Sequence, residues 1–186
     1  MKHIKDIKNK LDWEKYYNLD FDWNDWEFYK KNKLSEDFIR EFKDRVNWEY
    51  ISESQKLSED FIREFQDKVD WEYISFYPMP SNSFIREFKN NVNWNIISVK
   101  QKLSEDFIKE FKDKVDWMMI SRYQKLSESF IREFKDKLNW YMISGYQKLS
   151  KDFIREFKDK VNWEYISINK TLSKKIKEEC IRNFKN

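Results

Sequence analysis

The chain has 186 residues, enough for one domain, and its 37 Lys and Arg against 34 Asp and Glu give a net charge of +3. Aromatic residues make up 19% of it beside 38% charged residues, a mixture that excludes simple disorder. One Gly, two Pro and one Cys argue against a many-turned β fold and exclude an intramolecular disulfide framework. The sequence contains no apolar run of about 18 residues. It begins without the apolar stretch of a signal peptide, so we expect a cytoplasmic protein that does not span a membrane.

A repeat of 23 residues fills most of the chain. The sequence LSEDFIREF begins at Leu34 and recurs at Leu57, and its first position recurs at Pro80, Leu103, Leu126, Leu149 and Leu172. Tryptophan keeps the same spacing at Trp48, Trp71, Trp94, Trp117, Trp140 and Trp163. Residues 34–171 therefore form six complete repeats. We expect residues 1–33 to form a degenerate N-terminal repeat and cap, and residues 172–186 a C-terminal capping helix.

Each repeat is predicted to begin with an amphipathic helix. In the first repeat Ser35 is a good N-cap residue, and two acidic residues follow it in the first turn, where the helix dipole favours negative charge. Leu34, Phe38 and Phe42 share one side of the helical wheel with an isoleucine and a valine. This periodicity predicts a helix of about twelve residues.

A second, shorter helix is predicted from Trp48 to about Gln55, with Asn47 as its capping residue. Neither helix can bury its apolar side alone, so neighbouring repeats must stack. The large aromatic side chains compensate for the short repeat, and we expect residues such as Trp117 to lie in the core. The sequence therefore predicts an all-α fold, an α-solenoid of 23-residue helix-turn-helix repeats.

The repeat sequence LSEDFIREFKDKVDW, nearly intact at 57–71 and 103–117, resembles repeats in hypothetical proteins of giant DNA viruses of the mimivirus type. The resemblance covers about three quarters of the chain. The abundance of Lys, Asn, Ile, Phe and Tyr also fits an AT-rich coding genome. The resemblance implies a viral protein expressed in an infected protist, in the cytoplasm of the host cell. It implies no activity and no functional residues.

The sequence offers no catalytic, cofactor-binding or metal-binding constellation, and we expect neither an enzyme nor a cofactor. His3 is the only histidine, and Cys180 lies on the side of the last helix that should be buried. The carboxylates recur in every repeat, whereas a catalytic site is a unique constellation. Asn169 and Thr171 belong to a formal glycosylation triplet, which has no meaning without a secretory signal.

A row of one basic residue per repeat raises the alternative of a nucleic-acid-binding repeat protein. Its members are Arg40, Arg63, Arg86, Lys109, Arg132 and Arg155. Residues 34–171 contain 24 basic and 25 acidic residues, a net charge of −1, and i,i+4 pairs of opposite sign offset the field of this row. A nucleic-acid-binding surface is usually strongly basic, so nucleic acid is the less favoured partner.

Differences among the repeats point to a protein-binding surface on the second helix. Two positions of that helix vary between repeats, and both are expected to be exposed. They carry apolar residues at Phe76, Val99, Met118, Tyr141 and Ile168. Aligned positions on one surface of a solenoid commonly bind partners, and contiguous exposed apolar residues mark interaction sites. Scattered exposed apolar residues are also common on proteins that bind nothing there.

The charge changes along the array, from −6 over the first two repeats to +3 over residues 172–186. Opposite charges at the two ends would favour weak head-to-tail self-association, or reflect drift alone. The sequence therefore predicts a non-enzymatic interaction or scaffold module whose partner is an unknown protein, with host proteins among the candidates. A nucleic-acid binder and a self-associating structural protein are the alternatives.

Overall fold

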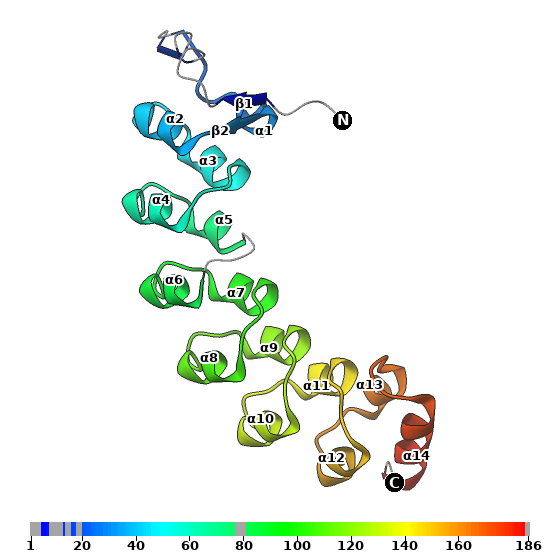
Figure 1. Ribbon diagram of the computed structural model, residues 1–186. Helices are drawn as coiled ribbons and strands as arrows, with labels where there is room; N and C mark the ends of the chain where they lie inside the picture. The colour runs from blue at the N-terminus through cyan, green and yellow to red at the C-terminus, as the bar shows by residue number, and fades with distance from the viewer. Residues whose placement is uncertain (1–4, 8–12, 14–15, 18–19, 77–80, 185–186) are drawn as a thin grey trace. The chain divides into compact units, whose positions relative to one another are not determined.

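The computed structural model describes residues 5–7, 13, 16–17, 20–76 and 81–184. The chain divides into two compact halves, an N-terminal half, Met1–Asn93, and a C-terminal half, Trp94–Asn186. Both halves consist mainly of short helices, as Figure 1 shows. The helices of the repeats recur every 23 residues. The predicted helical-repeat fold is confirmed.

The N-terminal half adds a short pair of strands that the all-α prediction lacked. The two strands are parallel, with Lys5 opposite Asn32 and Ile7 opposite Leu34. A strand at Lys5–Ile7 also differs from the degenerate repeat expected there, since the matching part of a complete repeat is helical. The elements of this half are β1 (Lys5–Ile7), α1 (Trp26–Lys31), β2 (Asn32–Leu34), α2 (Glu36–Glu41), α3 (Trp48–Ser54), α4 (Glu59–Glu64), α5 (Trp71–Phe76) and α6 (Asn82–Glu87).

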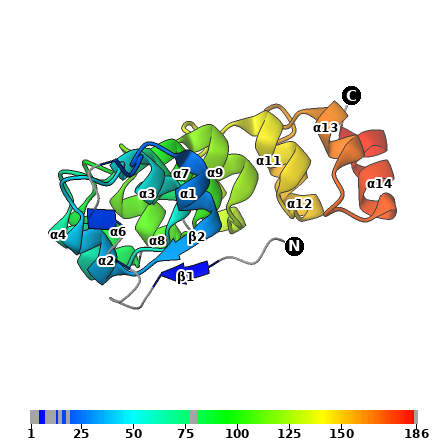
Figure 2. The same ribbon diagram turned by 90° about the horizontal axis from the view of Figure 1, so that it is seen from above.

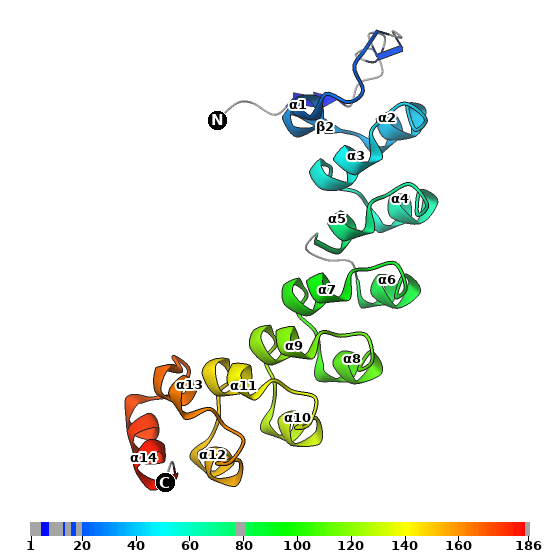
Figure 3. The ribbon, with the colours of Figure 1, turned by 180° about the vertical axis from the view of Figure 1, so that it is seen from behind.

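The C-terminal half contains only helices among its described residues, 94–184. They are α7 (Trp94–Lys100), α8 (Glu105–Glu110), α9 (Trp117–Tyr123), α10 (Glu128–Glu133), α11 (Trp140–Tyr146), α12 (Lys151–Glu156), α13 (Trp163–Ile168) and α14 (Lys174–Phe184). In the two opposite views of Figures 1 and 3, the first helices of the repeats (α8, α10, α12) form one layer, and the second helices (α7, α9, α11, α13) form the other.

The first helix of each repeat is shorter than the twelve residues expected. In α2 the serine cap is as predicted, since the Ser35 hydroxyl accepts the Phe38 N–H at 3.1 Å. The helix then ends at Glu41, and a turn follows in which the N–H groups of Arg45 and Val46 both donate to the Phe42 carbonyl. Phe42 and Val46 are still buried. The predicted apolar side is therefore present, although a turn rather than a helix carries its last part.

The tryptophan of each repeat is half-buried rather than fully buried, which corrects the expectation for Trp117. Its indole N–H donates at 2.9 Å to the Lys112 carbonyl, in the turn between the two helices of the same repeat. The ring lies 5.1 Å from Phe134 of the next repeat. In the N-terminal half Trp48 binds the Lys43 carbonyl and lies 4.9 Å from Phe65 in the same way. The tryptophan therefore connects neighbouring repeats at the edge of the core.

A buried serine in the second helix joins each repeat to the next. The Ser121 hydroxyl donates to the Trp117 carbonyl at 2.6 Å and accepts the backbone N–H of Asn139 in the following repeat at 2.9 Å. The hydroxyl therefore both donates and accepts a hydrogen bond, which explains why it can be buried. The equivalent serines are also fully buried: Ser52, Ser75, Ser98 and Ser144.

A buried glutamine after the second helix makes a second connection between repeats. Its side-chain NH₂ donates to two carbonyls of the preceding repeat and its carbonyl oxygen accepts a backbone N–H. For Gln124 the three partners are Ser98 O at 2.9 Å, Gln101 O at 2.8 Å and Leu103 N at 3.0 Å. Gln147 repeats this arrangement one step further along the chain.

The N-terminal segment continues the repeat contacts where the sequence departs from the period. Helix α1 takes the place of a second helix, because Gln55 binds the carbonyls of Tyr29 and Asn32 as Gln124 binds those of its own neighbours. The Tyr29 hydroxyl accepts the Asn47 N–H at 2.8 Å, the role that serine has in a complete repeat. Burial raises the pKa of Tyr29 to about 12. Trp23 packs 5.1 Å from Phe42, as Trp48 packs on the next repeat.

The C-terminal segment packs against the last complete repeat. Helix α14 contacts both α12 and α13, and Figure 2 shows it beside α13. Its Cys180 is fully buried, as predicted. Its Glu179 forms an ion pair with Lys151, which stands at the position where earlier repeats have a glutamate or asparagine.

Candidate protein-interaction surface

Five large apolar side chains are exposed on the second helices of the C-terminal half. Met118 is 44% exposed, Tyr141 56% and Ile168 63%, as the sequence predicted for these positions. Tyr123 and Tyr146 are also exposed, and the sequence analysis did not single them out. The name C-terminal patch is used below for Met118, Arg122, Tyr123, Tyr141, Tyr146 and Ile168.

The other two predicted surface residues do not belong to this patch. Val99 on α7 is half-buried, so the prediction that it is exposed is wrong. Phe76 is 53% exposed, as predicted, but it lies at the end of α5 in the N-terminal half.

The helices that carry the patch are neighbours. Helix α9 contacts α7 and α11, and α11 in turn contacts α13. Figure 1 shows α9, α11 and α13 following one another in a row. Side chains four residues apart on a helix share one side, so Met118 and Arg122 point to the same side of α9. The period of the repeat brings Tyr141 to the position on α11 that Met118 has on α9.

Contacts between the repeats hold the patch in place. The Arg122 guanidinium lies 5.1 Å from the Tyr123 ring and 4.8 Å from the Tyr146 ring of the next repeat, a cation–π arrangement with both. Tyr141 meets Tyr165 of the following repeat edge to face at 5.8 Å. These aromatic rings are therefore positioned before any partner arrives.

A glycine makes room for one of these rings. A Cβ atom on Gly145 would lie 2.8 Å from the Cδ1 atom of Tyr165, closer than side-chain atoms normally approach. Gly145 stands where other repeats have Glu53, Phe76, Val99, Arg122 and Ile168. The only glycine of the chain thus allows the tyrosine ring to lie across α11.

The N-terminal half presents acidic residues at the equivalent positions. Glu49 and Glu72 stand where the C-terminal half has Met118 and Tyr141, and Glu53 stands where it has Arg122. The indole N–H of Trp26 on α1 donates to Glu53 at 3.1 Å. These three glutamates, Glu49, Glu53 and Glu72, are called the acidic row below.

Four members of the predicted basic row on the first helices form ion pairs between repeats. Each pair joins a cation of one first helix to a glutamate of the next, at N–O distances of 2.6–2.9 Å. The pairs are Arg40–Glu64 and Arg63–Glu87 in the N-terminal half, and Lys109–Glu133 and Arg132–Glu156 in the C-terminal half. The sequence pattern predicts the ion pairs within a helix but does not indicate these pairs between repeats. These pairs offset the charge of four of the six residues of the row, which weighs against a phosphate-binding surface there.

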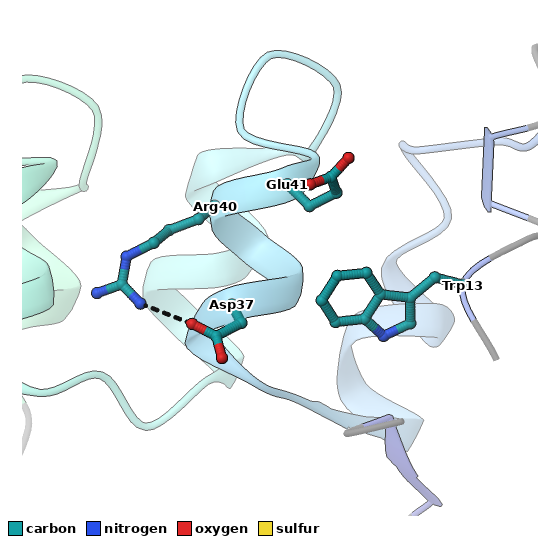
Figure 4. A pocket seen from close by; sticks show the side chains of 4 residues that line it. All are labelled: Trp13, Asp37, Arg40 and Glu41. Atoms are coloured by element: carbon teal, nitrogen blue, oxygen red, sulfur yellow. Dashed lines mark hydrogen bonds and ion pairs between the residues drawn. The ribbon is translucent and has the colours of Figure 1, made fainter. Parts of the chain in front are cut away.

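The pocket drawn in Figure 4 is a surface depression of about 360 Å³ in the N-terminal half. Trp13, Asp37, Arg40 and Glu41 line it. Arg40 binds Asp37 at 3.2 Å and Glu64 at 2.8 Å, and the Tyr17 hydroxyl donates to Glu41 at 2.7 Å. The carboxylates and the guanidinium therefore bond protein groups, and their arrangement has the character of an ion-pair network.

Further observations concern metal binding, membrane spanning, the single thiol and the glycosylation triplet. Among the described residues no group of three His, Cys, Asp or Glu could hold a metal ion, and no helix is long and apolar enough to cross a membrane. Burial raises the pKa of the Cys180 thiol, which disfavours the nucleophilic thiolate. Asn169 is fully buried and donates to the Ser144 and Gln147 carbonyls, so its amide belongs to the core. His3 lies outside the described residues.

No protein-family model, curated protein or solved structure matches this chain. The resemblance to repeats of giant-virus proteins stays a prediction. The repeat architecture and the two contrasting second-helix surfaces are the observations from which function is argued.

Proposed function

We propose that this chain is a non-enzymatic helical-repeat module that binds another protein through the C-terminal patch. The observation that carries the proposal is the exposure of Met118, Tyr141 and Ile168 on neighbouring helices. Apolar surface gains about 25 cal/mol for each Å² that a partner covers. In the N-terminal half Glu49 and Glu72 stand at the position of Met118 and Tyr141, so the repeat framework does not require apolar residues there.

The patch has the chemistry of a protein-binding surface. Tyrosine, methionine and arginine are enriched at protein interfaces, and tyrosine offers a large contact area with few rotatable bonds. Because Arg122 already lies between two tyrosine rings, a partner would lose little free energy in ordering them. In the setting that the giant-virus resemblance implies, the partner is a protein of the virus or of its host, met in the host cytoplasm.

The experiment compares affinity purification of the tagged full chain with that of the variant Met118→Glu/Tyr141→Glu. Glu72 and Glu164 show that other repeats accept glutamate at this position, so the fold should persist. The glutamates would place charge in a contact that excludes water, and partner proteins should be lost by more than about tenfold. Quantitative mass spectrometry of the co-purified proteins measures the loss.

The matched control is Lys112→Gln/Lys135→Gln, which changes the net charge by the same amount on the opposite layer of the same half. Both lysines are exposed and lie in the turns after α8 and α10. The control should retain every partner. If the patch variant retains them too, with circular dichroism unchanged, the binding surface lies elsewhere and the proposal is wrong.

A further inference from the structure

We propose that the C-terminal patch binds the acidic row on the N-terminal half of a second copy of this chain, so that copies associate head to tail. The inference rests on the proposed function and names its partner. It is argued from charge complementarity between two surfaces that share one repeat spacing.

Two glutamates of the acidic row, Glu49 and Glu72, carry negative charge that the described part of the chain does not neutralise. Glu49 and Glu72 are exposed on α3 and α5, and their carboxylates form no ion pair with any described residue. Tyr73 lies among these groups, and its pKa is raised, chiefly by the charge of Glu53 and then by burial and by Glu49. The local potential on this side of the N-terminal half is therefore negative.

The second helices of the C-terminal half, the layer that carries the C-terminal patch, bear, or are followed by, cations that also form no ion pair with the described residues. Arg122 contacts two tyrosine rings and forms no ion pair with the described residues. After each second helix an exposed lysine follows, likewise without an ion pair to the described residues: Lys102, Lys125, Lys148 and Lys170. Arg122 and these lysines therefore place positive charge without an ion pair on and directly after the second helices of the layer that carries the patch.

The net charges of the two halves agree with this local picture. Residues 1–93 contain 16 Lys and Arg against 20 Asp and Glu, a net charge of −4. Residues 94–186 contain 21 against 14, a net charge of +7. Long-range attraction between the two halves of different copies would speed their encounter and favour this orientation over like-to-like contact.

The two surfaces also match in spacing. Glu49 and Glu72 are one repeat apart on adjacent second helices, and the lysines that follow the second helices of the C-terminal half are also one repeat apart. Two solenoid surfaces with a common repeat can therefore form several ion pairs in one register. Met118, Tyr141 and Ile168 are exposed on the same second helices and would be covered in such a contact, which adds apolar burial to the electrostatic term.

The association is heterologous, because the two surfaces in contact differ. A copy bound through its patch still presents its own acidic row to another copy. Such contacts form a ring if the rotation between copies closes and an open chain if it does not. The mass of the assembly should therefore rise with concentration rather than stop by necessity at a dimer.

The test uses the purified full chain and multi-angle light scattering over a series from low to high micromolar concentration. The mean mass should rise with concentration at low salt, and the rise should shrink at high salt, because salt screens exposed charges. Two charge-reversal variants sharpen the test. One is Glu49→Lys/Glu72→Lys and the other is Arg122→Glu/Lys125→Glu. Each variant alone should associate more than about tenfold more weakly, since like charges then face each other.

Mixing the two variants should restore association. The first retains a native patch and the second a native acidic row, so one native interface can form between them. The control Lys112→Glu/Lys135→Glu makes the same charge change as the second variant on the opposite layer, and should associate as the parent chain does. Circular dichroism and thermal unfolding of each variant alone check that the fold is intact.

A chain that stays monomeric over the whole series overturns the proposal, and so does a mixture of folded variants that stays monomeric. Single-stranded RNA offers the other test of the patch, since bases stack on exposed tyrosines beside cations. A monomeric chain that binds a labelled oligouridine, and loses it in Arg122→Glu/Lys125→Glu, would assign the patch to nucleic acid and also overturn the proposal. Loss of partner proteins from Met118→Glu/Tyr141→Glu in cells would still support the proposed function, so the two failures can be told apart.

Discussion

The second helices of the two halves have the same framework and opposite surfaces. In α3 and α9 the buried side uses the same serine and isoleucine positions, Ser52 with Ile51 and Ser121 with Ile120. On the exposed side, Glu49 of α3 corresponds to Met118 of α9. The contrast shows that packing against the neighbouring repeats determines one side of the helix and leaves the other side open to function.

Part of the charge difference between the halves lies at exposed positions of the second helices. The first helices of both halves carry the same ion pairs, as in Arg40–Glu64 and Arg132–Glu156. On the second helices, Glu49, Glu53 and Glu72 of the N-terminal half correspond to Met118, Arg122 and Tyr141 of the C-terminal half, whereas α13 keeps a glutamate, Glu164. Variation among exposed positions of the second helices is what a repeat protein that binds partners through them would show.

The largest expected effect tests whether the framework is common to both halves. Gln124→Leu keeps the approximate size of the side chain but leaves two carbonyls and one N–H without their partner in the core. Each buried group left unsatisfied costs about 1–3 kcal/mol, so we expect a loss of about 3 kcal/mol or more. Gln55→Leu in the N-terminal half should cost a similar amount, because its three hydrogen bonds are equivalent. Chemical denaturation measures both.

The control for this pair is Lys125→Gln, a change at the exposed neighbour of Gln124. It should alter the free energy of unfolding by less than about 0.5 kcal/mol. If Gln124→Leu unfolds at the same denaturant concentration as the control, the glutamine hydrogen bonds are not what joins the repeats. A large loss in one half alone would show that the two frameworks differ.

The sequence reveals the periodic parts of this fold because the same physical requirement recurs in every repeat. Serine caps, apolar spacing and the tryptophan interval predict the helices and their stacking, and Cys180 was correctly placed in the core. The prediction of a twelve-residue first helix is wrong, because apolar periodicity does not distinguish a helix from a helix followed by a compact turn. The core position of Trp117 was wrong because its indole N–H has a polar partner at the edge of the repeat.

The buried polar residues that join the repeats could have been predicted from the sequence, because they recur at the same position of the repeat. Serine recurs at Ser52, Ser75, Ser98, Ser121 and Ser144, a constancy that solvent exposure does not explain. Their burial follows from hydrogen bonds to the next repeat, which a single-helix analysis cannot show. The role of Tyr29 was beyond reach, since a tyrosine hydroxyl replaces a serine hydroxyl there without any match in sequence. The exposure of Met118 and Tyr141 was predicted, whereas their partner remains a matter for experiment.

A smaller effect is expected at Gly145, where the other repeats carry a larger side chain. Through helix propensity alone, Gly145→Ala should raise the free energy of unfolding by about 1 kcal/mol. The new Cβ atom would also meet Tyr165 at 2.8 Å, and overpacking costs about 1–3 kcal/mol. The substitution should therefore destabilise the chain by up to about 2 kcal/mol. In a Tyr165→Ala background the contact is absent, and the same change should stabilise it by about 1 kcal/mol.

A double-mutant cycle over these variants separates the two effects. A change of sign between the backgrounds would show that the ring packs on the glycine and that the patch is built around this contact. If Gly145→Ala has the same effect in both backgrounds, the ring moves aside without cost, and the patch is less ordered than its contacts indicate. Thermal unfolding by circular dichroism is sufficient to measure both.

The smallest effect concerns pH and a contact that joins two first helices of the N-terminal half. Burial alone would raise the pKa of Glu59, but hydrogen bonds from the Ser81 N–H and hydroxyl, with the charge of Arg63, lower it below its ordinary value. A carboxylate with a lowered pKa stabilises the fold above its ordinary pKa. That contribution disappears as the pH falls through the lowered value. Since Glu59 is partly exposed, the contribution should stay below about 1 kcal/mol.

Glu59→Gln should therefore be slightly less stable than the parent chain at neutral pH. The difference should remain constant down to about pH 5 and then shrink toward zero as the solution becomes more acidic, because the parent carboxyl is then protonated as well. Thermal unfolding of both chains at a series of pH values measures the difference. A difference that stays constant over the whole acidic range would show that the amide and the carboxylate differ in shape or hydrogen bonding rather than in charge. In that case the Glu59–Ser81 contact would join the repeats without contributing to their pH dependence.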